Sequence, residues 1–426
     1  TTYGKMAKAA SQLPIPEQVE LKPAHQWRVI GQALRRLDTR DKVNGRQIYG
    51  IDLRLPGMKI ATLHQCPVLG GKLKSFDAKA AMSMQGVHKV VAVDEQAVAV
   101  IADTFWVAKN ALKLVHIEWD WGPHANLNSA QIEAMLTEGL TAEQAFVGHR
   151  AGDMKSARAQ AAKTHQSRYE FPFLHQAPLE PMNATALWTS ERCEAWVPTQ
   201  DGEASLAAVI AASGLRADQC EVYKINPGGG FGRRGAFQDY TRQSVLLARQ
   251  MPNVPIKLIW TREEDMTHGH YHPMMAWQMT GTFDAQQKLT GLHMRLSGPS
   301  TLAAVQPTTL NQQGGRDPLV FLGVSDGGEH GLCYDLPNLM VEHAMRNTPV
   351  PPGFWRGLYS NPNALFLECF MDELAEQAGM DAWTFRRQFM APYPRQLAVL
   401  DAVAQGIGWD QNPDKGLHRG LAVMRA

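Results

Sequence analysis

The chain has 426 residues, of which 44% are hydrophobic and 19% are charged, which is the composition of a folded globular protein with room for two or three domains. Its 42 basic and 41 acidic residues give a formal net charge of +1, which argues against the strongly basic surface of a nucleic-acid-binding protein. No apolar run reaches the roughly 18–20 residues that span a bilayer, and the longest candidate, 90–107, is interrupted by acidic residues.

The five cysteines stand far apart in the sequence, and no two of them form a CxxC pair. This spacing excludes a disulfide framework and provides no zinc or iron–sulfur motif. The cysteines are Cys66, Cys193, Cys220, Cys333 and Cys369.

Residues 1–27 predict an N-terminal linker, because a short helical pattern gives way to the extended segment LPIP. Residues 28–123 alternate short strand patterns with a helical one, which indicates a compact α/β domain. Residues 124–150 are polar and partly helical and predict a connector. In these parts we expect helices at 5–12, 104–115 and 129–140 and strands at 48–53, 59–63, 87–93, 98–102 and 115–119.

Residues 151–426 mix both kinds of pattern without an internal repeat, so we expect an α+β or mixed α/β fold overall. The expected helices are 154–163, 203–213, 240–249 and 363–379, and the expected strands are 167–173, 184–188, 194–197, 222–225, 255–260, 275–283 and 288–297. Residues 298–333 read as irregular. Because the sequence begins at Thr1 without an initiating Met and ends in a strand-like run at 420–425, we expect a piece of a longer polypeptide.

The most informative segment is a glycine-rich loop at 227–235 (PGGGFGRRG), which lies between a strand pattern and a helical pattern. Its glycines let the backbone approach a ligand with no Cβ atom in the way. Free amide groups at the start of the following helix favour an anion, and Arg233 and Arg234 add forked positive donors. The segment therefore predicts a binding loop for a phosphorylated or otherwise anionic ligand.

Two other interpretations of this loop stay open. Residues 230–235 match the GxGxxG pattern, so a nicotinamide-dependent dehydrogenase that uses 220–265 as a Rossmann-like unit is one of them. Against it stand the bulky Phe231 and an acidic strand end at 263–265, which lies about 30 residues on instead of the usual ~20. The other interpretation is a structural loop with incidental glycines.

Two further segments carry chemically useful side chains. In HQAPLEP at 175–181, His175 and Glu180 either line a pocket or belong to a junction between a loop and a strand. In WRG at 355–357, a large aromatic ring stands beside a permanent cation, which either clamps an anionic group or forms a plain salt bridge.

The alternating histidines of HGHYH at 268–272 would share one face of a strand, as metal ligands do. No carboxylate or cysteine accompanies them at a diagnostic spacing, so we expect histidines of a surface or a pocket rim. Asp372 and Glu373 fall among apolar residues of the helix expected at 363–379 and predict its polar face, not a catalytic pair.

Together these motifs resemble the molybdenum-binding large subunit of the xanthine dehydrogenase/aldehyde oxidase superfamily, in particular isoquinoline 1-oxidoreductase beta subunits and periplasmic or membrane-associated aldehyde dehydrogenases. The stretches 36–45 and 52–58 are similar to the family's small α/β hammerhead domain, which would occupy 28–123 ahead of a molybdopterin-binding domain at 151–426, incomplete at its C-terminus. The motifs that carry the resemblance are GGGFGRR at 228–234, PTQ at 198–200, HQAPLEP at 175–181, WRG at 355–357 and DELA at 372–375.

The resemblance implies an oxidoreductase with a molybdopterin cytosine dinucleotide cofactor that oxidises an N-heterocycle or an aldehyde, with water as the oxygen source. Xanthine is not expected, because Leu174 or His175 stands where xanthine-type members carry a glutamine. The implied cofactor-binding residues are Gly229, Gly230, Phe231, Gly232, Arg233, Gln200, Arg356 and Gly357, and the implied substrate-pocket residues are His175, Glu180 and Trp355.

The general-base glutamate of the family is expected beyond Ala426, so a non-catalytic cofactor-binding fragment is a further alternative. The resemblance also implies electron transfer to a small subunit with 2Fe–2S clusters and a cytochrome c as a further acceptor. A periplasmic or membrane-associated location is implied as well, although the sequence shows no signal peptide.

Overall fold

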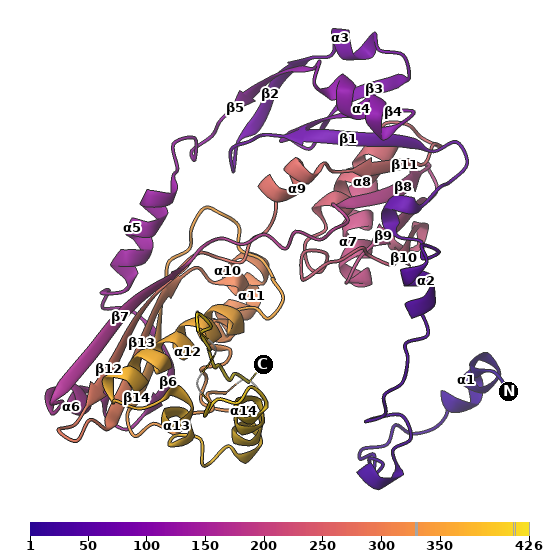
Figure 1. Ribbon diagram of the computed structural model, residues 1–426. Coiled ribbons are helices and arrows are strands. Elements are labelled where there is room, and N and C mark those ends of the chain that lie inside the picture. The colour runs from indigo at the N-terminus through magenta and orange to yellow at the C-terminus, as the bar shows by residue number, and fades with distance from the viewer. Residues whose placement is uncertain (329–330, 412, 414, 426) are drawn as a thin grey trace. The chain divides into compact units, whose positions relative to one another are not determined.

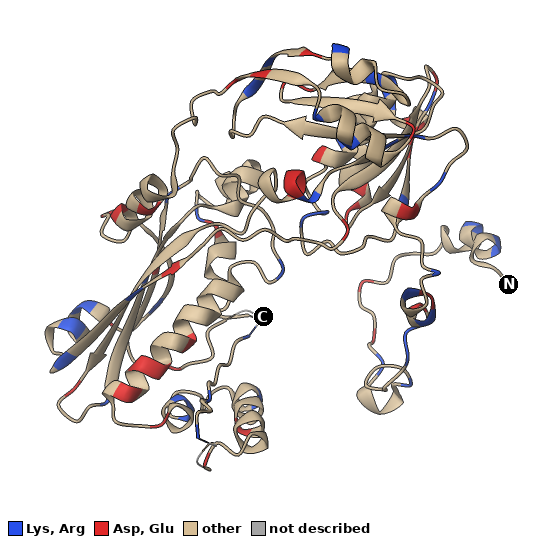
Figure 2. Cartoon of the chain, turned by 45° about the horizontal axis from the view of Figure 1, so that its top comes forward, with Lys and Arg blue, Asp and Glu red and all other residues tan. Residues whose placement is uncertain are grey.

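The computed structural model describes residues 1–328, 331–411, 413 and 415–425. The chain divides into two compact units, Thr1–Ile48 and Tyr49–Ala426, which we call unit 1 and unit 2. Acidic and basic side chains are interspersed along the elements of both units (Figure 2), in keeping with the near-neutral net charge.

Unit 1 is built from short helices separated by extended chain (Figure 1). Its first helix begins where the Thr2 side chain accepts a hydrogen bond from the backbone N–H of Lys5. None of its helices contains a buried residue, so unit 1 has no core of its own. Its elements are α1 (Tyr3–Ala10), η1 (Ala24–Gln26) and α2 (Thr39–Val43).

A seven-stranded sheet in unit 2 has the strand order β10-β9-β8-β11-β1-β4-β3. Strands β1, β9, β10 and β11 run in one direction, whereas β4 and β8 run in the other. The strands are β1 (Lys59–Gln65), β3 (Val87–Val93), β4 (Ala97–Ala102), β8 (Asn183–Trp188), β9 (Cys193–Pro198), β10 (Cys220–Ile225) and β11 (Ile256–Ile259).

Helices cover both faces of this sheet, and the alternation of side chains along a strand decides which face each residue meets. On β4, Ala99 and Ile101 join the core that includes helices α7 (Gly202–Ser213) and α8 (Asp239–Arg249). Val100 and Ala102, which point the other way, pack with α4 (Phe105–Leu112). All six residues of β4 are buried, as expected for a strand covered on both faces.

The direction of the strands brings the important loops to one edge of the sheet. β9, β10 and β11 have their carboxyl ends at this edge, and the antiparallel β8 has its amino end there. The loops that follow β9, β10 and β11 and the loop that precedes β8 therefore meet, although they are far apart in the sequence. In open α/β sheets, ligands bind at this kind of edge.

A five-stranded sheet, with the order β6-β14-β13-β12-β7, forms the second layer system of unit 2. On β12, Trp277 packs against the ring of Phe366 in α12, while the neighbouring Ala276 packs with α5. Helices thus cover both faces of this sheet too. The elements are β6 (Phe146–Ala151), β7 (Lys163–Phe171), β12 (Met275–Phe283), β13 (Leu289–Gly298), β14 (Leu339–Met345), α5 (Ser129–Gly139), α12 (Ser360–Gln377), α13 (Ala382–Arg387) and α14 (Pro394–Gly406).

The remaining elements of unit 2 are short and connect these layers. β2 (Lys72–Asp77) and β5 (His116–Asp120) form a two-stranded sheet. The others are η2 (Gly50–Asp52), α3 (Lys79–Met82), α6 (Met154–Ala159), η3 (Ala217–Gln219), α9 (Arg262–Thr267), α10 (Thr301–Val305), α11 (Pro307–Gln312) and η4 (Pro318–Phe321).

The structure confirms the expected α+β fold and corrects several expected elements. The expected strand at 48–53 is instead the turn η2, held by a hydrogen bond from the Tyr49 N–H to the Asp52 carboxylate. Helix α6 ends at Ala159 because the chain enters β7 at Lys163. The described part of the segment 298–333 contains α10, α11 and η4. Residues 420–425 form no strand.

The structure does not form the Rossmann-like unit that is the alternative interpretation of 220–265. In such a unit the strand after the helix lies directly beside the strand before it. Here β10 is an edge strand next to β9, and β11, which follows α8, is separated from β10 by β9 and β8. β9 and β10 are adjacent and parallel, and α7 joins them.

The expected domain boundaries stay a prediction. Strands β1, β3 and β4 of the predicted domain 28–123 share a sheet with strands β8, β9, β10 and β11 of the predicted domain 151–426.

Candidate functional site

Gln200 joins the glycine-rich loop after β10 to the loop after β9 through two hydrogen bonds. The Gln200 backbone N–H donates to the Arg234 carbonyl at 2.9 Å, and the Gln200 side-chain oxygen accepts from the Gly232 N–H at 3.1 Å. A Cβ at residue 230 would lie 2.4 Å from that side-chain oxygen. A side chain at position 230 would therefore displace the Gln200 amide, which passes directly over this glycine.

The backbone conformation at position 232 requires glycine. Its φ of +99° is unfavourable for other residues, and a Cβ there would lie 2.4 Å from the Phe354 carbonyl oxygen. Between these glycines, the Phe231 backbone oxygen accepts a hydrogen bond from the Arg356 N–H at 3.0 Å. The glycine-rich loop and the segment 354–357 are thus in direct backbone contact.

Three non-glycine residues with positive φ occur at this edge, one in each of three loops. They are Ala177 (φ 43°), Phe231 (φ 54°) and Leu358 (φ 49°). Such a conformation costs about 1–3 kcal/mol and persists only where the surroundings impose it. Phe231 is also 42% exposed, so the strain holds an aromatic ring at the surface of the loop.

Glu180 lies beneath the glycine-rich loop. One carboxylate oxygen accepts from the Ile51 N–H and the other from the Gly228 N–H, both at 2.8 Å. The second oxygen also pairs with the buried Arg234 guanidinium at 3.1 Å. Because both oxygens are occupied by protein donors, Glu180 anchors the loop in this structure.

The side chains of Arg233 and Arg234 correct the expectation that they face an anion. Both are fully buried. Arg233 forms a bidentate ion pair with Asp239 at 3.0 and 2.7 Å and lies 5.6 Å from the centre of the Trp260 ring. Arg234 donates to backbone carbonyls and to Glu180. Charge in a glycine-rich loop looks ligand-facing in the sequence, but these two arginines hold the loop from inside.

Arg356 is an exposed cation in the segment that contacts the glycine-rich loop. Its side chain is exposed, and the described part of the chain gives its guanidinium no hydrogen-bond or ion-pair partner. The next residue, Gly357, has a φ of +85°, and a Cβ there would lie 2.6 Å from the Asn361 side chain. The WRG motif therefore presents a free cation beside the exposed Phe231.

Gln176 joins the loops from within. Its side-chain NH₂ donates to the carbonyls of His270 at 2.7 Å and Phe354 at 2.8 Å. Trp355 reaches the same region, where its indole N–H donates to the His175 carbonyl at 3.3 Å. Sequence reasoning named His175 and Trp355 but passed over Gln176, which stands in the same HQAPLEP motif.

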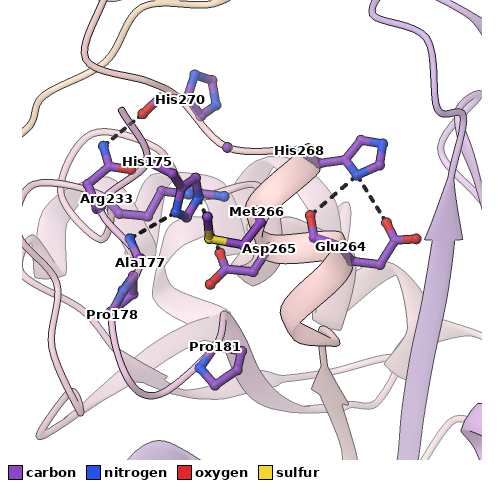
Figure 3. A network of polar contacts seen from close by, with 12 residues as sticks. His175, Ala177, Pro178, Pro181, Arg233, Glu264, Asp265, Met266, His268 and His270 are labelled. Atoms are coloured by element: carbon purple, nitrogen blue, oxygen red, sulfur yellow. Dashed lines mark hydrogen bonds and ion pairs between the residues drawn. The ribbon is translucent and has the colours of Figure 1, made fainter. Parts of the chain in front are cut away.

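Buried polar atoms without a hydrogen-bond partner gather behind these loops (Figure 3). The His175 Nδ1 accepts from the Ala177 N–H at 2.8 Å, and its Nε2 lies 3.7 Å from Asp265. Burial, with the charges of Arg233 and Arg262, lowers the pKa of His175 to about 4, and burial raises the pKa of Asp265 to about 6. The unpartnered atoms of the described residues include His175 Nε2, Gln176 Oε1, Arg233 Nε, Asp265 Oδ1 and His270 Nδ1 in this region.

The histidines of HGHYH go to separate surroundings. His268 pairs with Glu264 at 3.1 Å, His270 stacks on Phe237 with ring centres 3.6 Å apart, and His272 is buried. Over the described ranges, no three His, Cys, Asp or Glu side chains form a group that could hold a metal ion. Sequence reasoning did not single out Asp265 or His270 as partners of His175, because that pairing depends on tertiary contacts.

On α12, the two acidic residues have structural partners. Asp372 binds Arg386 at 2.6 Å. Glu373 binds His165 at 2.7 Å and also contacts the hydroxyl groups of Ser167 and Tyr169. This is the polar face that the sequence predicts.

The family described as the molybdopterin cofactor-binding domain matches residues 138–390, which is more than half of the chain. The chain belongs to this family. The match covers the glycine-rich loop, Gln200 and the WRG motif, and it confirms the resemblance to molybdenum-binding large subunits of the xanthine dehydrogenase family.

Two relatives match almost the whole chain. The isoquinoline 1-oxidoreductase subunit beta of Brevundimonas diminuta is 26% identical and matches 98% of this chain and 54% of its own length. The membrane-bound aldehyde dehydrogenase (pyrroloquinoline-quinone) of Gluconacetobacter polyoxogenes is also 26% identical and matches 96% of this chain and 52% of its own length. The chain therefore spans about half the length of the relatives it matches.

The crystal structure of quinoline 2-oxidoreductase from Pseudomonas putida 86 has the same fold over most of the chain. Its TM-score is 0.68 at 17% sequence identity, and the match covers 89% of this chain and 55% of that one. Within the described ranges, no helix has the length and apolar character needed to cross a lipid bilayer.

Proposed function

We propose that the chain is the cofactor-binding part of a molybdopterin-dependent oxidoreductase and holds the cofactor at the edge formed by the glycine-rich loop, Gln200 and the segment 354–357. The observation that carries this proposal is the close packing of Gln200 and the Phe354 carbonyl against Gly230 and Gly232. This contact lies in a chain that belongs to the molybdopterin cofactor-binding family. When bound, this cofactor supplies the redox centre for the oxidation of an organic substrate.

The donor set at this edge fits such a group. Gly230 and Gly232 let the Gln200 side chain and the Phe354 carbonyl pack directly against the loop, which fixes the backbone that would hold the group. The Arg356 side chain offers a cation with no protein partner in the described chain, and the backbone of Gly229 and Gly230 offers amide groups suited to phosphate or pterin oxygens. The Gly232 N–H is already held by Gln200, so we propose that Gly232 contributes through its backbone conformation. Phe231 provides an exposed ring beside them. We propose that Arg233 contributes by fixing the loop, not by touching the cofactor.

We assign the chain's side chains to positioning and not to proton transfer. Gln200 and Gln176 fix the relative position of the loops through the hydrogen bonds described above. Glu180 is unsuited to be a general base, because Ile51, Gly228 and Arg234 occupy its carboxylate oxygens. His175 and Trp355 are proposed to border the substrate pocket, with His175 neutral near pH 7 because burial lowers its pKa to about 4.

The proposed substrate is an N-heterocycle or an aldehyde, in line with the names of the two relatives. We propose the cytosine dinucleotide form of the cofactor, water as the oxygen source, and electron transfer to an iron–sulfur subunit and a cytochrome c. The designation of the first relative as a subunit beta agrees with a partner subunit. A periplasmic or membrane-associated location is likewise proposed, in keeping with the membrane-bound relative.

The loop can be tested by adding a side chain at either glycine. We expect Gly232→Ala and Gly230→Val to lower the molybdenum content of the purified protein, expressed together with its partner subunits, by at least about tenfold. The new side chain meets the Phe354 carbonyl at position 232 and displaces the Gln200 amide at position 230. The measurement is elemental analysis of molybdenum per chain. Gly202→Ala is the matched control, since nothing lies within 4 Å of a Cβ at that position.

The outcomes separate the alternatives. Molybdenum retained in both loop variants would move the cofactor site elsewhere, and absence of molybdenum from the wild-type complex would remove the proposal. Molybdenum bound without oxidation of any aldehyde or N-heterocycle would instead support a cofactor-binding fragment that lacks catalysis.

A further inference from the structure

A pocket separate from the glycine-rich loop lies among β1, α4, β5 and α9 of unit 2. Its volume is about 660 Å³, which is within the range of small-molecule sites. Nothing in the proposed function uses it. Its lining residues are Leu63, His64, Lys109, Leu112, Lys113, Val115, Ile117, Trp119, Thr261, Glu263 and Glu264.

The pocket has an apolar wall that suits a flat ring. Leu112 from α4 and Ile117 from β5 provide aliphatic surface, and Trp119 provides an indole. The Trp119 ring meets the His64 ring edge-on with centres 6.0 Å apart. Aromatic side chains at a pocket wall favour aromatic ligands in offset or edge-on contact.

Lys109 in α4 and Lys113, the C-cap residue of this helix, add positive charge at one side. Lys109 and Lys113 are four residues apart, so both point to the same side of the helix, and both line the pocket. Neither ammonium group forms an ion pair with any residue that the structure describes; Lys113 donates only to Asn110, at 3.3 Å. Glu263 also lines the pocket. Its carboxylate is held by its own backbone N–H and by the Thr261 hydroxyl, and these hydrogen bonds together with the charge of Lys109 lower its pKa. The lining thus carries two ammonium groups without an ion pair and one carboxylate that already has protein hydrogen-bond donors.

The second acidic residue, Glu264, already has partners within the protein. Its carboxylate lies between His64 and His268 and accepts from the Gln65 N–H at 3.3 Å (Figure 3 shows the His268 side). Burial alone would raise the pKa of Glu264, but the hydrogen bonds to His268 and His64 lower it to about 2. Because Nδ1 of His64 is held by Glu264, the ring nitrogen left for a ligand is Nε2, on a side chain that is 43% exposed.

We propose that this pocket binds a small aromatic carboxylate, with its ring against Trp119 and its carboxylate between the two lysines and the His64 ring. The apolar wall accounts for the ring, and the unpaired ammonium groups account for the negative charge. The site is distinct from the proposed cofactor edge, since within α9 Glu264 faces His64 whereas Asp265 faces His175.

Isothermal titration of the full chain with 2-naphthoate tests this site, with the uncharged 2-naphthamide as the matched ligand. We expect naphthoate to bind and naphthamide to bind at least about tenfold more weakly. Lys109→Met and Lys113→Met should each weaken naphthoate binding about threefold, and the double variant about tenfold, because each removes one partly solvated charge contact. Lys79→Met, on α3 outside the pocket, should change nothing.

A second readout avoids any dependence on the folding of the variants. Naphthoate binding to the wild-type chain should weaken as NaCl rises from about 20 mM to about 300 mM, because salt screens exposed charges. The proposal is overturned by absent naphthoate binding, by equal binding of naphthamide, by an unchanged affinity in the folded double variant, or by salt-independent binding.

Discussion

Arg233 and Arg234 show how a residue's role depends on whether its side chain points into the protein or toward solvent. In the sequence they are two forked cations in a glycine-rich loop. In the structure both guanidinium groups are buried and bound to protein partners, Asp239 for Arg233 and Glu180 for Arg234. Arg356, whose side chain is exposed and has no partner among the described residues, comes from a segment more than a hundred residues away in the sequence. Packing decided which of these arginines stays exposed.

The buried pair Glu180–Arg234 gives a residue-scale prediction. Glu180→Gln removes the negative charge, leaves a buried guanidinium unpaired and brings NH₂ donors against the N–H groups of Ile51 or Gly228. We expect a loss of about 3 kcal/mol in the free energy of unfolding, measured by urea denaturation. Glu133→Gln, at an exposed position of α5, is the control, and an equal effect of both changes would contradict the anchoring role.

At the scale of elements, the direction of the strands determines which loops lie together. The carboxyl ends of β9, β10 and β11 share one edge with the amino end of β8. Loops that are distant in the sequence therefore meet there without needing similar sequences. The sequence predicted nearly all of these strands, because their apolar alternation is local, but it could not predict their order in the sheet.

His343 in β14 gives an element-scale prediction about pH. It is fully buried, and its Nε2 lies 2.9 Å from the Gly298 carbonyl. Burial lowers its pKa to about 4 from an ordinary 6.5. Between these values the unfolded chain binds a proton that the native chain does not, so stability is lost as pH falls through this window, by up to about 3 kcal/mol.

His343→Gln should remove this contribution. We expect the wild-type free energy of unfolding to decrease more steeply than that of the variant between about pH 6.5 and pH 4. Urea denaturation at several pH values checks it. The other histidines are the same in both proteins, so the difference between the two curves isolates His343, and parallel curves would show that its pKa is not lowered.

For the whole molecule, the contrast between the two units is the main feature. Unit 1 has no buried residue in its helices, whereas unit 2 contains large cores under both sheets. Segments with little buried apolar surface open with a small free-energy cost.

Limited proteolysis should reveal this contrast. Trypsin at low ratio should cut first within Thr1–Ile48, which contains several exposed lysines and arginines, and leave the rest of the chain intact for longer. Mass spectrometry of the first fragments identifies the sites. First cuts within the seven-stranded sheet would contradict the division into these units.

The sequence by itself determined the fold class, most of the strands and helices, and the motifs that meet at the candidate site, because strand and helix periodicity and glycine requirements are local. It also carried the resemblance to the molybdenum-binding family. Only the tertiary structure decided that Gln176 and Gln200 join the loops, that Arg233 and Arg234 turn inward, and that β10 and β11 are not neighbours. Those facts depend on contacts between residues far apart in the chain, and local patterns do not specify such contacts.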